Sequence, residues 1–583
     1  MKLAWFAAFA VALLSAAPAL ADANKQTKGN WDDKFRQLEV DLPSPNTYRA
    51  ASGAPGESYW QQQADYQINV TLDEVKKRIT ATGTITYRNN SPHPLNYIWL
   101  QLDQNIFKQD SASRRSAKAS AGPMGRGDQV GMGAIKQLQS YQETPHGFEI
   151  RSVTDGGSRA LRYTVNDTMM RIDLPQPLAA KGTTTIKLAW AFNIVDNDLF
   201  GGRSGYEYFR ENDTYTFFQA QWFPRLVAYT DYTGWQHKQF LGQGEFTLEF
   251  GNYDVSVTLP ADHIMTATGV LQNPNEVLSA EQRNRLAQAR KEYSKPMYIV
   301  TPEEALANEK EGTTATKTWR WKAGNVRDFA WASSRKFIWD AMNVKQPEGG
   351  DVLAQSLFPN EADPLWSLYS TRAVAHTIDV YSEFSFPYPY PNAISVNTWL
   401  GGGMEYPMIS FNGYRPVKDD KTGKKTYTRQ SKNGLIGVVI HEVGHNYFPM
   451  IVNSDERQWT WMDEGLNSFL EFMAELRWDE NFPVMGDNAN SLDEIGSYMM
   501  SEDQVPIMTN SESVIQFGNN AYNKPAAALT VLRETVMGRE LFDFAFKEYA
   551  RRWKFKRPTP SDFFRTMEDA SGVDLDWFWR GWF

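Results

Sequence analysis

Two histidines lie four residues apart in an otherwise apolar stretch, and a glutamate follows the first of them. They are His441, Glu442 and His445, within "GLIGVVIHEVGHNYFPMIV" (434–452). On an α-helix, positions i and i+4 share a face, so both imidazoles can bind one metal ion. Zinc suits such a pair, because it binds neutral imidazole at about 2.0–2.1 Å. Glu442 lies about 100° further around the helix, where it can reach a water molecule on the metal without being a ligand.

The alternative is a buried helix in which these residues have only a structural role. That alternative buries three polar side chains in an apolar helix without partners, which costs free energy. We therefore prefer the metal site.

A catalytic zinc ion usually has three protein ligands and one open position. The third candidate is Glu464, nineteen residues after His445, at the start of the predicted helix in "DEGLNSFLEFMAELRW". Asp463 competes as a ligand, but its place directly before the apolar run favours an N-cap. The next closest histidine is His376. We expect His441, His445 and Glu464 to bind one zinc ion (Zn2+) per chain.

Four segments resemble one protein family. "HEVGHNYFPMIVNSDERQWTWMDEG" (441–465) resembles the H-E-x-x-H-x18-E signature of the gluzincins, and specifically of the aminopeptidase N-like zinc metallopeptidases. Upstream, "GGGMEYP" (401–407) resembles the G-x-M-E-N exopeptidase motif of that family. "AYNKPAAAL" (521–529) resembles the segment with the family's catalytic tyrosine, and "NVRDFAWASS" (325–334) resembles the end of its N-terminal β domain. In this order the segments cover much of residues 60–583.

The resemblance implies a catalytic role for five of the matched residues. His441, His445 and Glu464 would bind the zinc ion. Glu442 would take a proton from the attacking water and pass it to the leaving amine. Tyr522 would donate a hydrogen bond to the oxyanion of the tetrahedral intermediate.

The upstream motif implies an exopeptidase. Glu405 would pair with the free α-amine of the substrate. Gly402, Gly403 and Met404 would line the extended substrate. Tyr406 stands where the family usually has Asn, so the shape of this pocket departs from the family pattern.

Two further roles stay open. "FFQAQWFPRL" (217–226) resembles the segment that offers a second polar contact to the substrate amine, and either Gln219 or Gln221 could provide it. Glu471 could orient a histidine of the metal site. For Glu471 an exposed position on the helix is the preferred interpretation.

The length and the apolar pattern predict an α+β multidomain protein. A chain of 583 residues is too long for one core. Residues 60–270 alternate apolar and polar as strands do, and beyond about residue 335 the apolar spacing becomes helical. The resemblance implies a β-rich, saddle-like domain followed by a mainly helical, thermolysin-like catalytic domain. We predict a signal peptide (1–21), an N-terminal β domain (22–335) with a flexible insertion (108–133), and a zinc peptidase domain (336–583).

Both chain ends and the composition bear on location and partners. "MKLAWFAAFAVALLSAAPALADANK" has the lysine, the short apolar run and the small-x-small ending of a secretory signal, so we expect a periplasmic or secreted protein without stable membrane insertion after cleavage. The absence of cysteine excludes disulfides and thiolate ligands. A net charge of −9 argues against nucleic acid as a partner.

The last residues, "DLDWFWRGWF", look like the close of the catalytic domain. Most relatives continue into a β-sandwich and a helical domain. We therefore expect a short family member or a truncated chain.

Together these features predict a zinc-dependent aminopeptidase that acts on peptides with a free N-terminus. The alternative is a thermolysin-like zinc endopeptidase that uses the same pair of helices. An epoxide hydrolase side activity and an inactive peptide-binding scaffold are lesser alternatives.

Overall fold

The computed structural model of the chain describes residues 42–116, 131–310, 312–398, 401–483 and 491–583. The predicted signal peptide (1–21) and residues 117–130 of the predicted insertion lie outside these ranges. Within the described ranges, no helix has both the length and the apolarity that crossing a membrane requires.

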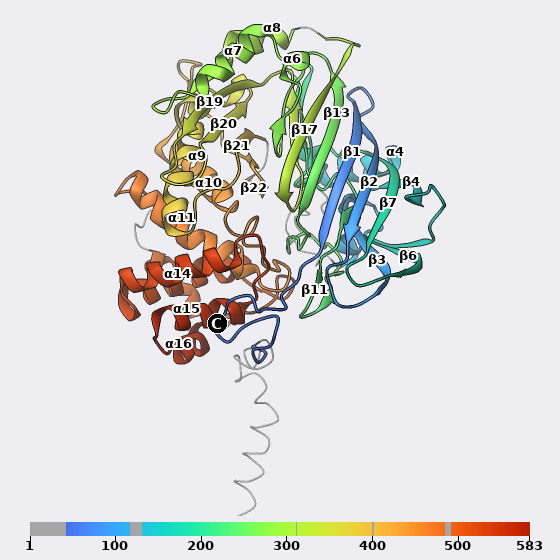
Figure 1. The fold of residues 1–583 in the computed structure, drawn as a ribbon. Coiled ribbons are helices and arrows are strands. Elements are labelled where there is room, and N and C mark those ends of the chain that lie inside the picture. The colour runs from blue at the N-terminus through green and yellow to red at the C-terminus, as the bar shows by residue number, and fades with distance from the viewer. Residues whose placement is uncertain (1–41, 117–130, 311, 399–400, 484–490) are drawn as a thin grey trace, which may run out of the picture.

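Among the described residues, the first half of the chain consists mainly of strands in three larger sheets and one two-stranded sheet (Figure 1). In β1 every second residue from Ala64 to Leu72 is buried, so one face packs on the core and the other faces outward. The largest sheet has the order β15 (Val270–Leu271), β17 (Thr316–Val326), β13 (Gly251–Pro260), β1 (Gln63–Asp73), β2 (Arg78–Arg88), β7 (Thr183–Asn193), β4 (Glu149–Asp155). The second has the order β10 (Arg225–Leu226), β3 (Leu95–Gln101), β6 (Met169–Leu178), β5 (Tyr163–Asn166), and the third β14 (Ile264–Ala267), β18 (Trp331–Ser334), β9 (Thr214–Gln219), β8 (Gly205–Phe209). The predicted β-rich N-terminal domain is confirmed.

Short elements and one long loop connect these sheets. The elements are η2 (Asp103–Phe107), α3 (Ala112–Ser116), α4 (Met132–Glu143), α5 (Asn197–Phe200), β11 (Tyr229–Thr230), β12 (Gly234–Trp235), α6 (Pro274–Val277), α7 (Ala280–Ala289) and α8 (Pro302–Asn308). The loop between β12 and β13 contacts the second half of the chain, because the N–H of Phe246 donates to Glu456 at 2.6 Å and the hydroxyl of Thr247 donates to Asp455 at 3.0 Å. This loop therefore reaches from the β domain towards the helices that carry the predicted metal ligands.

A six-stranded sheet opens the second half of the molecule. Its order is β16 (Met297–Val300), β19 (Ile338–Val344), β20 (Val352–Phe358), β21 (Asn392–Asn397), β23 (Ile409–Asn412), β22 (Gly403–Tyr406). β19, β20 and β21 are buried at every position, so their sequences lack the alternation by which strands are recognised. β16 precedes residue 335 but joins this sheet, so the sheet draws on both sides of the predicted domain boundary, and that boundary stays a prediction.

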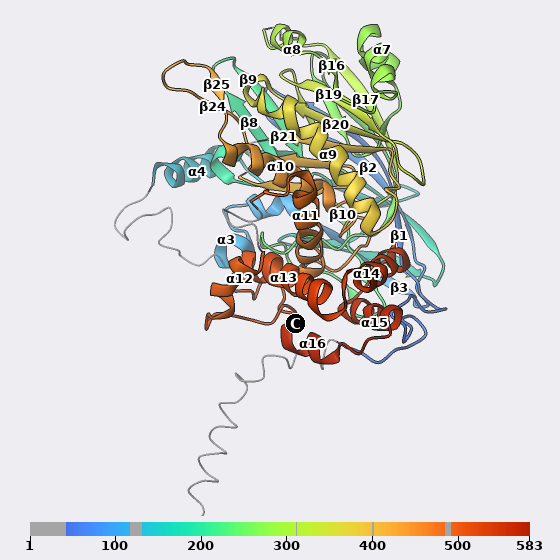
Figure 2. The same ribbon diagram turned by 90° about the vertical axis from the view of Figure 1, so that its left-hand side faces the viewer.

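Helices cover this sheet and form the lower part of the molecule. α9 (Leu365–Phe384) and α10 (Arg429–Gly444) pack on the sheet, and α11 (Glu464–Trp478) packs on α10 (Figure 2). The remaining elements are η3 (Asn360–Ala362), β24 (Val417–Lys418), β25 (Lys425–Thr426), η4 (Thr460–Met462), α12 (Ser491–Met499), the π-helix η5 (Gly518–Asn523), α13 (Lys524–Val531), the π-helix η6 (Leu532–Val536), α14 (Arg539–Trp553), α15 (Pro560–Ser571) and α16 (Asp576–Trp582). The predicted mainly helical second half is confirmed.

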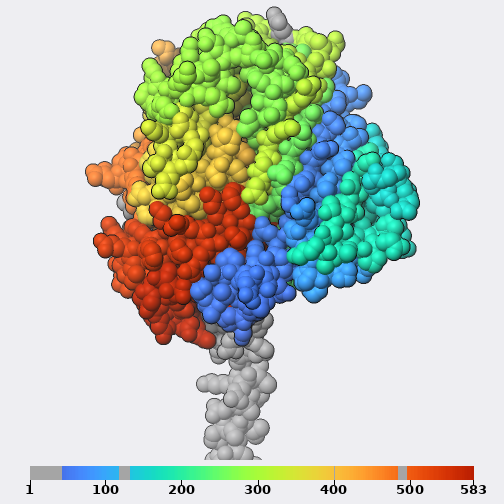
Figure 3. Space-filling view, in the orientation of Figure 1, coloured from blue at the N-terminus to red at the C-terminus, as the bar shows by residue number. Residues whose placement is uncertain are grey.

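The segment that begins the described part of the chain contacts both the β domain and the C-terminal helices. Arg49 forms buried ion pairs with Asp231 of the β domain and Asp562 of α15. The indole N–H of Trp553 donates to the carbonyl of Gly53 at 2.8 Å. In Figure 3 this blue segment lies directly against the red C-terminal helices. These contacts stabilise the β domain in a fixed position relative to the helices below it.

Candidate active site

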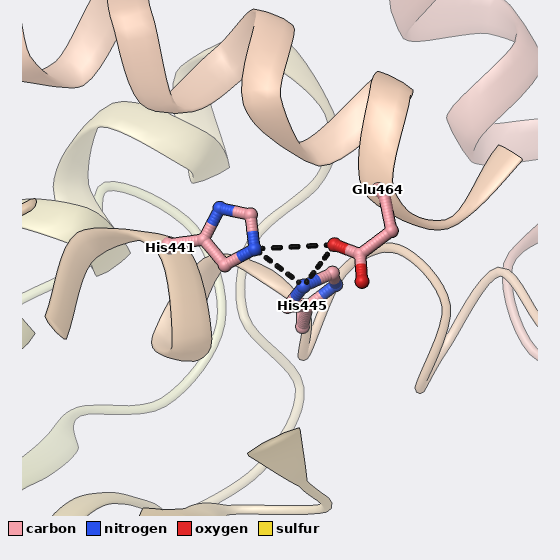
Figure 4. Close-up of side chains that lie close together, drawn as sticks. All are labelled: His441, His445 and Glu464. Carbon is pink, nitrogen blue, oxygen red and sulfur yellow. Dashed lines mark hydrogen bonds and ion pairs between the residues drawn. The ribbon is translucent and has the colours of Figure 1, made fainter. Parts of the chain in front are cut away.

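The three predicted metal ligands converge on one point (Figure 4). His441 belongs to the last turn of α10, His445 follows directly after that helix, and Glu464 is the first residue of α11. Oε2 of Glu464 lies 3.2 Å from Nε2 of His441 and 3.2 Å from Nε2 of His445, and the two nitrogens are 3.0 Å apart. Ligands at about 2.0–2.1 Å in tetrahedral geometry would lie about 3.3 Å from one another. The donor atoms and their spacing therefore fit one zinc ion.

The second nitrogen of each histidine is held by the protein. Nδ1 of His441 lies 2.8 Å from a carboxylate oxygen of Glu471, and Nδ1 of His445 lies 2.9 Å from the carbonyl of Phe448 and 3.0 Å from Asp463. These contacts direct both Nε2 atoms to the metal position. Asp463 occupies the predicted N-cap position of α11, but its side chain caps no backbone N–H there. The preferred interpretation of Glu471 was wrong, because only 16% of its side chain is accessible.

Close helix packing positions the two histidines. A Cβ at Gly444 would lie 2.4 Å from the hydroxyl of Tyr381 on α9 and 2.5 Å from the side-chain oxygen of Asn467 on α11. Asn467 accepts a hydrogen bond from Tyr381 and donates one to the carbonyl of His441 at 2.9 Å. Only a glycine at position 444 allows the three helices to approach this closely, so the site is held on rigid elements.

The carboxylate of Glu442 lies between His445 and strand β22. Its Oε2 is buried without a hydrogen-bond partner. Burial raises the pKa of Glu442 to about 7, a value that the positive charge of a bound metal would lower. A Cβ at Gly403 would lie 2.3 Å from Cγ of Glu442, so the strand passes directly over this carboxylate. Glu442 can therefore accept and return a proton beside the metal position.

The predicted exopeptidase motif lies on the same strand. Gly403, Met404 and Glu405 belong to β22 at the edge of the sheet, and Gly402 directly precedes it. Glu405 is 3% exposed, and its Oε1 is buried without a hydrogen-bond partner. Ligand atoms of Glu405, Glu442 and His445 lie within 4.8 Å of one another. The structure therefore brings the proposed amine-binding carboxylate next to the metal ligands.

Tyr406, which departs from the family motif, is also buried. Its ring packs on Phe411 with 5.3 Å between the centroids, and its hydroxyl has no hydrogen-bond partner. Burial raises the pKa of the Tyr406 hydroxyl well above its usual range.

Tyr522 reaches the metal site from the π-helix η5. Its hydroxyl donates to Oε1 of Glu464 at 2.5 Å, and its ring stacks on His441 with 5.7 Å between the centroids. Short π-helical turns occur frequently at functional sites. The hydroxyl is therefore placed where it can donate a hydrogen bond to a reacting group.

The two glutamines of the β domain are buried, and neither forms a hydrogen bond with Glu405. The amide of Gln219 donates to the carbonyl of Gly205 at 2.8 Å. Nε2 of Gln221 is buried without a partner, and Gln221 lines a cavity of about 480 Å³ together with Arg203. The choice between Gln219 and Gln221 as an amine contact stays a prediction.

Sequence reasoning missed two residues of this site. Glu245, in the loop between β12 and β13, lies with its carboxylate within 4.8 Å of those of Glu456 and Asp463. Arg203 donates to Glu245 at 2.5 Å and to the sulfur of Met404 at 3.1 Å. No spacing or periodicity links either residue to the motif histidines, because both lie in irregular segments of the other domain.

Comparison with known proteins identifies the class. Residues 369–582 match the model of the peptidase family M1 domain. This match covers all three metal ligands, the exopeptidase motif and Tyr522. It confirms the resemblance to the aminopeptidase N-like zinc metallopeptidases, and the second half of the chain carries a peptidase family M1 domain.

Individual relatives share this region. Glutamyl aminopeptidase of Bos taurus is 26% identical over 211 residues, which is 35% of this chain and 22% of that protein. Probable aminopeptidase 1 of Sulfurisphaera tokodaii is 26% identical over 228 residues, which is 37% of this chain and 28% of that protein. The matched region thus spans less than a third of the length of these curated relatives.

Solved structures share the whole architecture. The M1 zinc metallopeptidase from Deinococcus radiodurans superposes with a TM-score of 0.53 at 13% identity, over 91% of this chain and 96% of that chain. A mutant of that protein bound to a Tyr-Ser-Ala substrate has a TM-score of 0.55 at the same identity. These likenesses show that the chain has the two-domain fold of M1 metallopeptidases.

Proposed function

We propose that the protein is a zinc-dependent aminopeptidase that hydrolyses the first peptide bond of peptides with a free N-terminus. The observation that carries this proposal is the position of Glu405, whose buried carboxylate lies within 4.8 Å of ligand atoms of Glu442 and His445. A carboxylate so close to the metal position can hold a substrate's α-ammonium at a fixed distance from the reacting bond. The M1 domain match and the aminopeptidase names of the relatives support the same activity.

His441, His445 and Glu464 would hold one zinc ion per chain. When bound there, zinc supplies Lewis-acid chemistry and makes water at the site more acidic. The matched relatives among solved structures are zinc metallopeptidases, which supports this choice of metal.

The remaining steps are performed by the chain's own residues. Glu442 accepts the proton of the attacking water and delivers it to the nitrogen of the leaving peptide. Tyr522 donates a hydrogen bond to the oxyanion that forms at the scissile carbonyl. β22 is an edge strand, so its backbone can pair with an extended substrate as an added strand would. This pairing aligns the first peptide bond with Glu442.

The location proposal rests on the first 21 residues, whose pattern is that of a secretory signal. We place the mature protein in the periplasm or outside the cell, where its substrates would be peptides rather than nucleic acids. Export can be checked by expressing the full chain and determining the N-terminal residue of the product in each cell fraction.

One experiment separates the proposed activity from a thermolysin-like endopeptidase. Glu405→Ala is compared with the wild type on an aminoacyl fluorogenic substrate and on an N-acetylated peptide, with and without a chelator. The aminopeptidase proposal expects chelator-sensitive turnover of the free-amine substrate that falls about a hundredfold or more in the variant, because a charge-assisted bond is lost. Turnover of the acetylated peptide that is unaffected by the substitution would instead establish the endopeptidase.

A further inference from the structure

We propose that Glu245 is a second carboxylate of the subsite that binds the substrate's N-terminus, and that it binds the α-ammonium group together with Glu405. This inference rests on the proposed aminopeptidase activity and adds a residue that no sequence motif indicated. Glu245 reaches the catalytic half from the loop between β12 and β13. The subsite would therefore be assembled from both domains.

Arg203 holds the Glu245 carboxylate beside the strand that carries Glu405. Glu245 is 6% exposed, and its Oε1 accepts a hydrogen bond from Nη1 of Arg203 at 2.5 Å. The same nitrogen donates to Sδ of Met404, the residue before Glu405, at 3.1 Å. The remaining oxygen of Glu245, Oε2, is buried without a hydrogen-bond partner. One oxygen of Glu245 is thus fixed, and the other is available to a ligand.

Glu405 forms no ion pair within the described part of the chain, and its Oε1 is buried without a hydrogen-bond partner. Arg203 lies nearby but is already paired with Glu245. Nη1 of Arg203 contacts both Glu245 and the residue directly before Glu405, so the two carboxylates lie in the same part of the site. Two buried carboxylates in one site repel each other and are stabilised by a cation placed between them.

The charges of the subsite match one ammonium group. Glu245 and Glu405 contribute two negative charges and Arg203 one positive charge, so the ion pair leaves a single negative charge. An α-ammonium carries one positive charge and three N–H donors. The unpartnered Oε2 of Glu245 and Oε1 of Glu405 can accept two of these donors. An acetylated N-terminus has no charge and one N–H, so the subsite would reject it.

A second metal ion is the competing occupant, because Glu245, Glu456 and Asp463 could also ligate one. Their other contacts argue against it. Glu456 forms an ion pair with Arg327, and Asp463 lies 3.0 Å from Nδ1 of His445. Each of the three carboxylates thus already faces one nitrogen of the protein, from Arg203, Arg327 and His445 respectively, which disfavours a metal ion between them.

The test measures binding in the zinc-loaded full chain with Glu442→Gln, so that ligands are not hydrolysed. Calorimetry gives the affinity for Leu-Gly-Gly and for N-acetyl-Leu-Gly-Gly, with and without Glu245→Gln. Loss of one charge-assisted hydrogen bond should weaken the free-amine peptide about tenfold to a hundredfold. The affinity for the acetylated peptide should stay unchanged, and zinc content should remain one per chain.

Glu207→Gln is the matched control. Glu207, on β8, is 7% exposed and forms an ion pair with Arg415, so it belongs to a carboxylate–arginine pair of similar burial. This control should leave the ratio of the two affinities unchanged.

Three results would overturn the inference. The first is an equal loss of affinity for the free-amine and the acetylated peptide in Glu245→Gln. The second is a loss of affinity that is confined to peptides that begin with Arg or Lys. The third is a metal content of two ions per chain in the parent protein that falls to one in the variant. The proposed function is judged separately, by turnover of the aminoacyl substrate in the wild type. Turnover combined with an unchanged affinity ratio in Glu245→Gln would refute only the role of Glu245.

Discussion

Removing the carboxylate of Glu471 should weaken zinc binding without touching a metal ligand. The carboxylate lies 2.8 Å from Nδ1 of His441, so it fixes the ring and directs Nε2 to the metal position. Glu471→Ala removes this contact and leaves the three ligands in place.

The expected loss of zinc affinity is about tenfold, or about 1.4 kcal/mol, at the lower end of the range for partners of metal-binding histidines. The lower end applies because 16% of the Glu471 side chain is accessible, so water can replace the lost acceptor. Glu471→Gln keeps an acceptor and loses the charge, so its loss should be smaller than that of Glu471→Ala.

The assay is a competition titration of zinc against a chromogenic chelator at constant pH, with unfolding temperature as a check on stability. Glu475→Gln is the control. Glu475 lies one turn further along α11 and is buried, and glutamine has nearly the same size, so the substitution changes the same helix without touching a histidine contact. An unchanged zinc affinity in Glu471→Ala would refute the reasoning, and an equal loss in Glu475→Gln would attribute the effect to the helix as a whole.

Three further predictions address catalysis and stability. Gly403→Ala should lower kcat and retain zinc, because the new Cβ would lie 2.3 Å from Cγ of Glu442 and displace its carboxylate. Steady-state kinetics combined with metal analysis tests this prediction. A variant with the kcat of the wild type would contradict it. Glu442→Gln should also retain zinc and lose turnover by several orders of magnitude, since the proton acceptor is gone; undiminished hydrolysis would exclude the mechanism. Burial alone would raise the pKa of the Glu74 carboxyl. Hydrogen bonds from His263 and Arg335 outweigh this effect and lower that pKa from 4.5 to about 2. The stabilisation by Glu74 is therefore complete above about pH 4.5 and is lost as the pH falls towards 2, so Glu74→Gln should cost about 2 kcal/mol at neutral pH and progressively less in acid, as denaturant unfolding at several pH values would show.

Much of the metal site could be predicted because its signal is local. His441 and His445 are related by helix geometry alone, and Glu464 begins the next predicted helix, so few residues of chain separate the ligands. Glu405 and Tyr522 lie further away, and only the family resemblance linked them to the metal. Their roles as substrate and transition-state contacts stay predictions, although the structure places both beside the ligands.

The strands of the catalytic half were harder to predict for a physical reason. β19, β20 and β21 are buried on both faces, so no alternation marks them, and their apolar runs read like the buried helices that follow. β16 lies before residue 335 but joins the six-stranded sheet of the catalytic half by pairing with β19. Such pairing depends on contacts between segments that are distant in the chain.

The sequence by itself predicted the metal ligands, the type of reaction and the order of a β-rich half and a helical half. Those conclusions depend on residue types and on short spacings, which helix geometry converts directly into positions in space. Only the tertiary structure decided that Glu471 and Asp463 contact the histidines, that Gly403 passes over Glu442, and that the β domain inserts Arg203 and Glu245 beside Glu405. These contacts join elements that are distant in the chain, and packing rather than local propensity selects which side chains meet there.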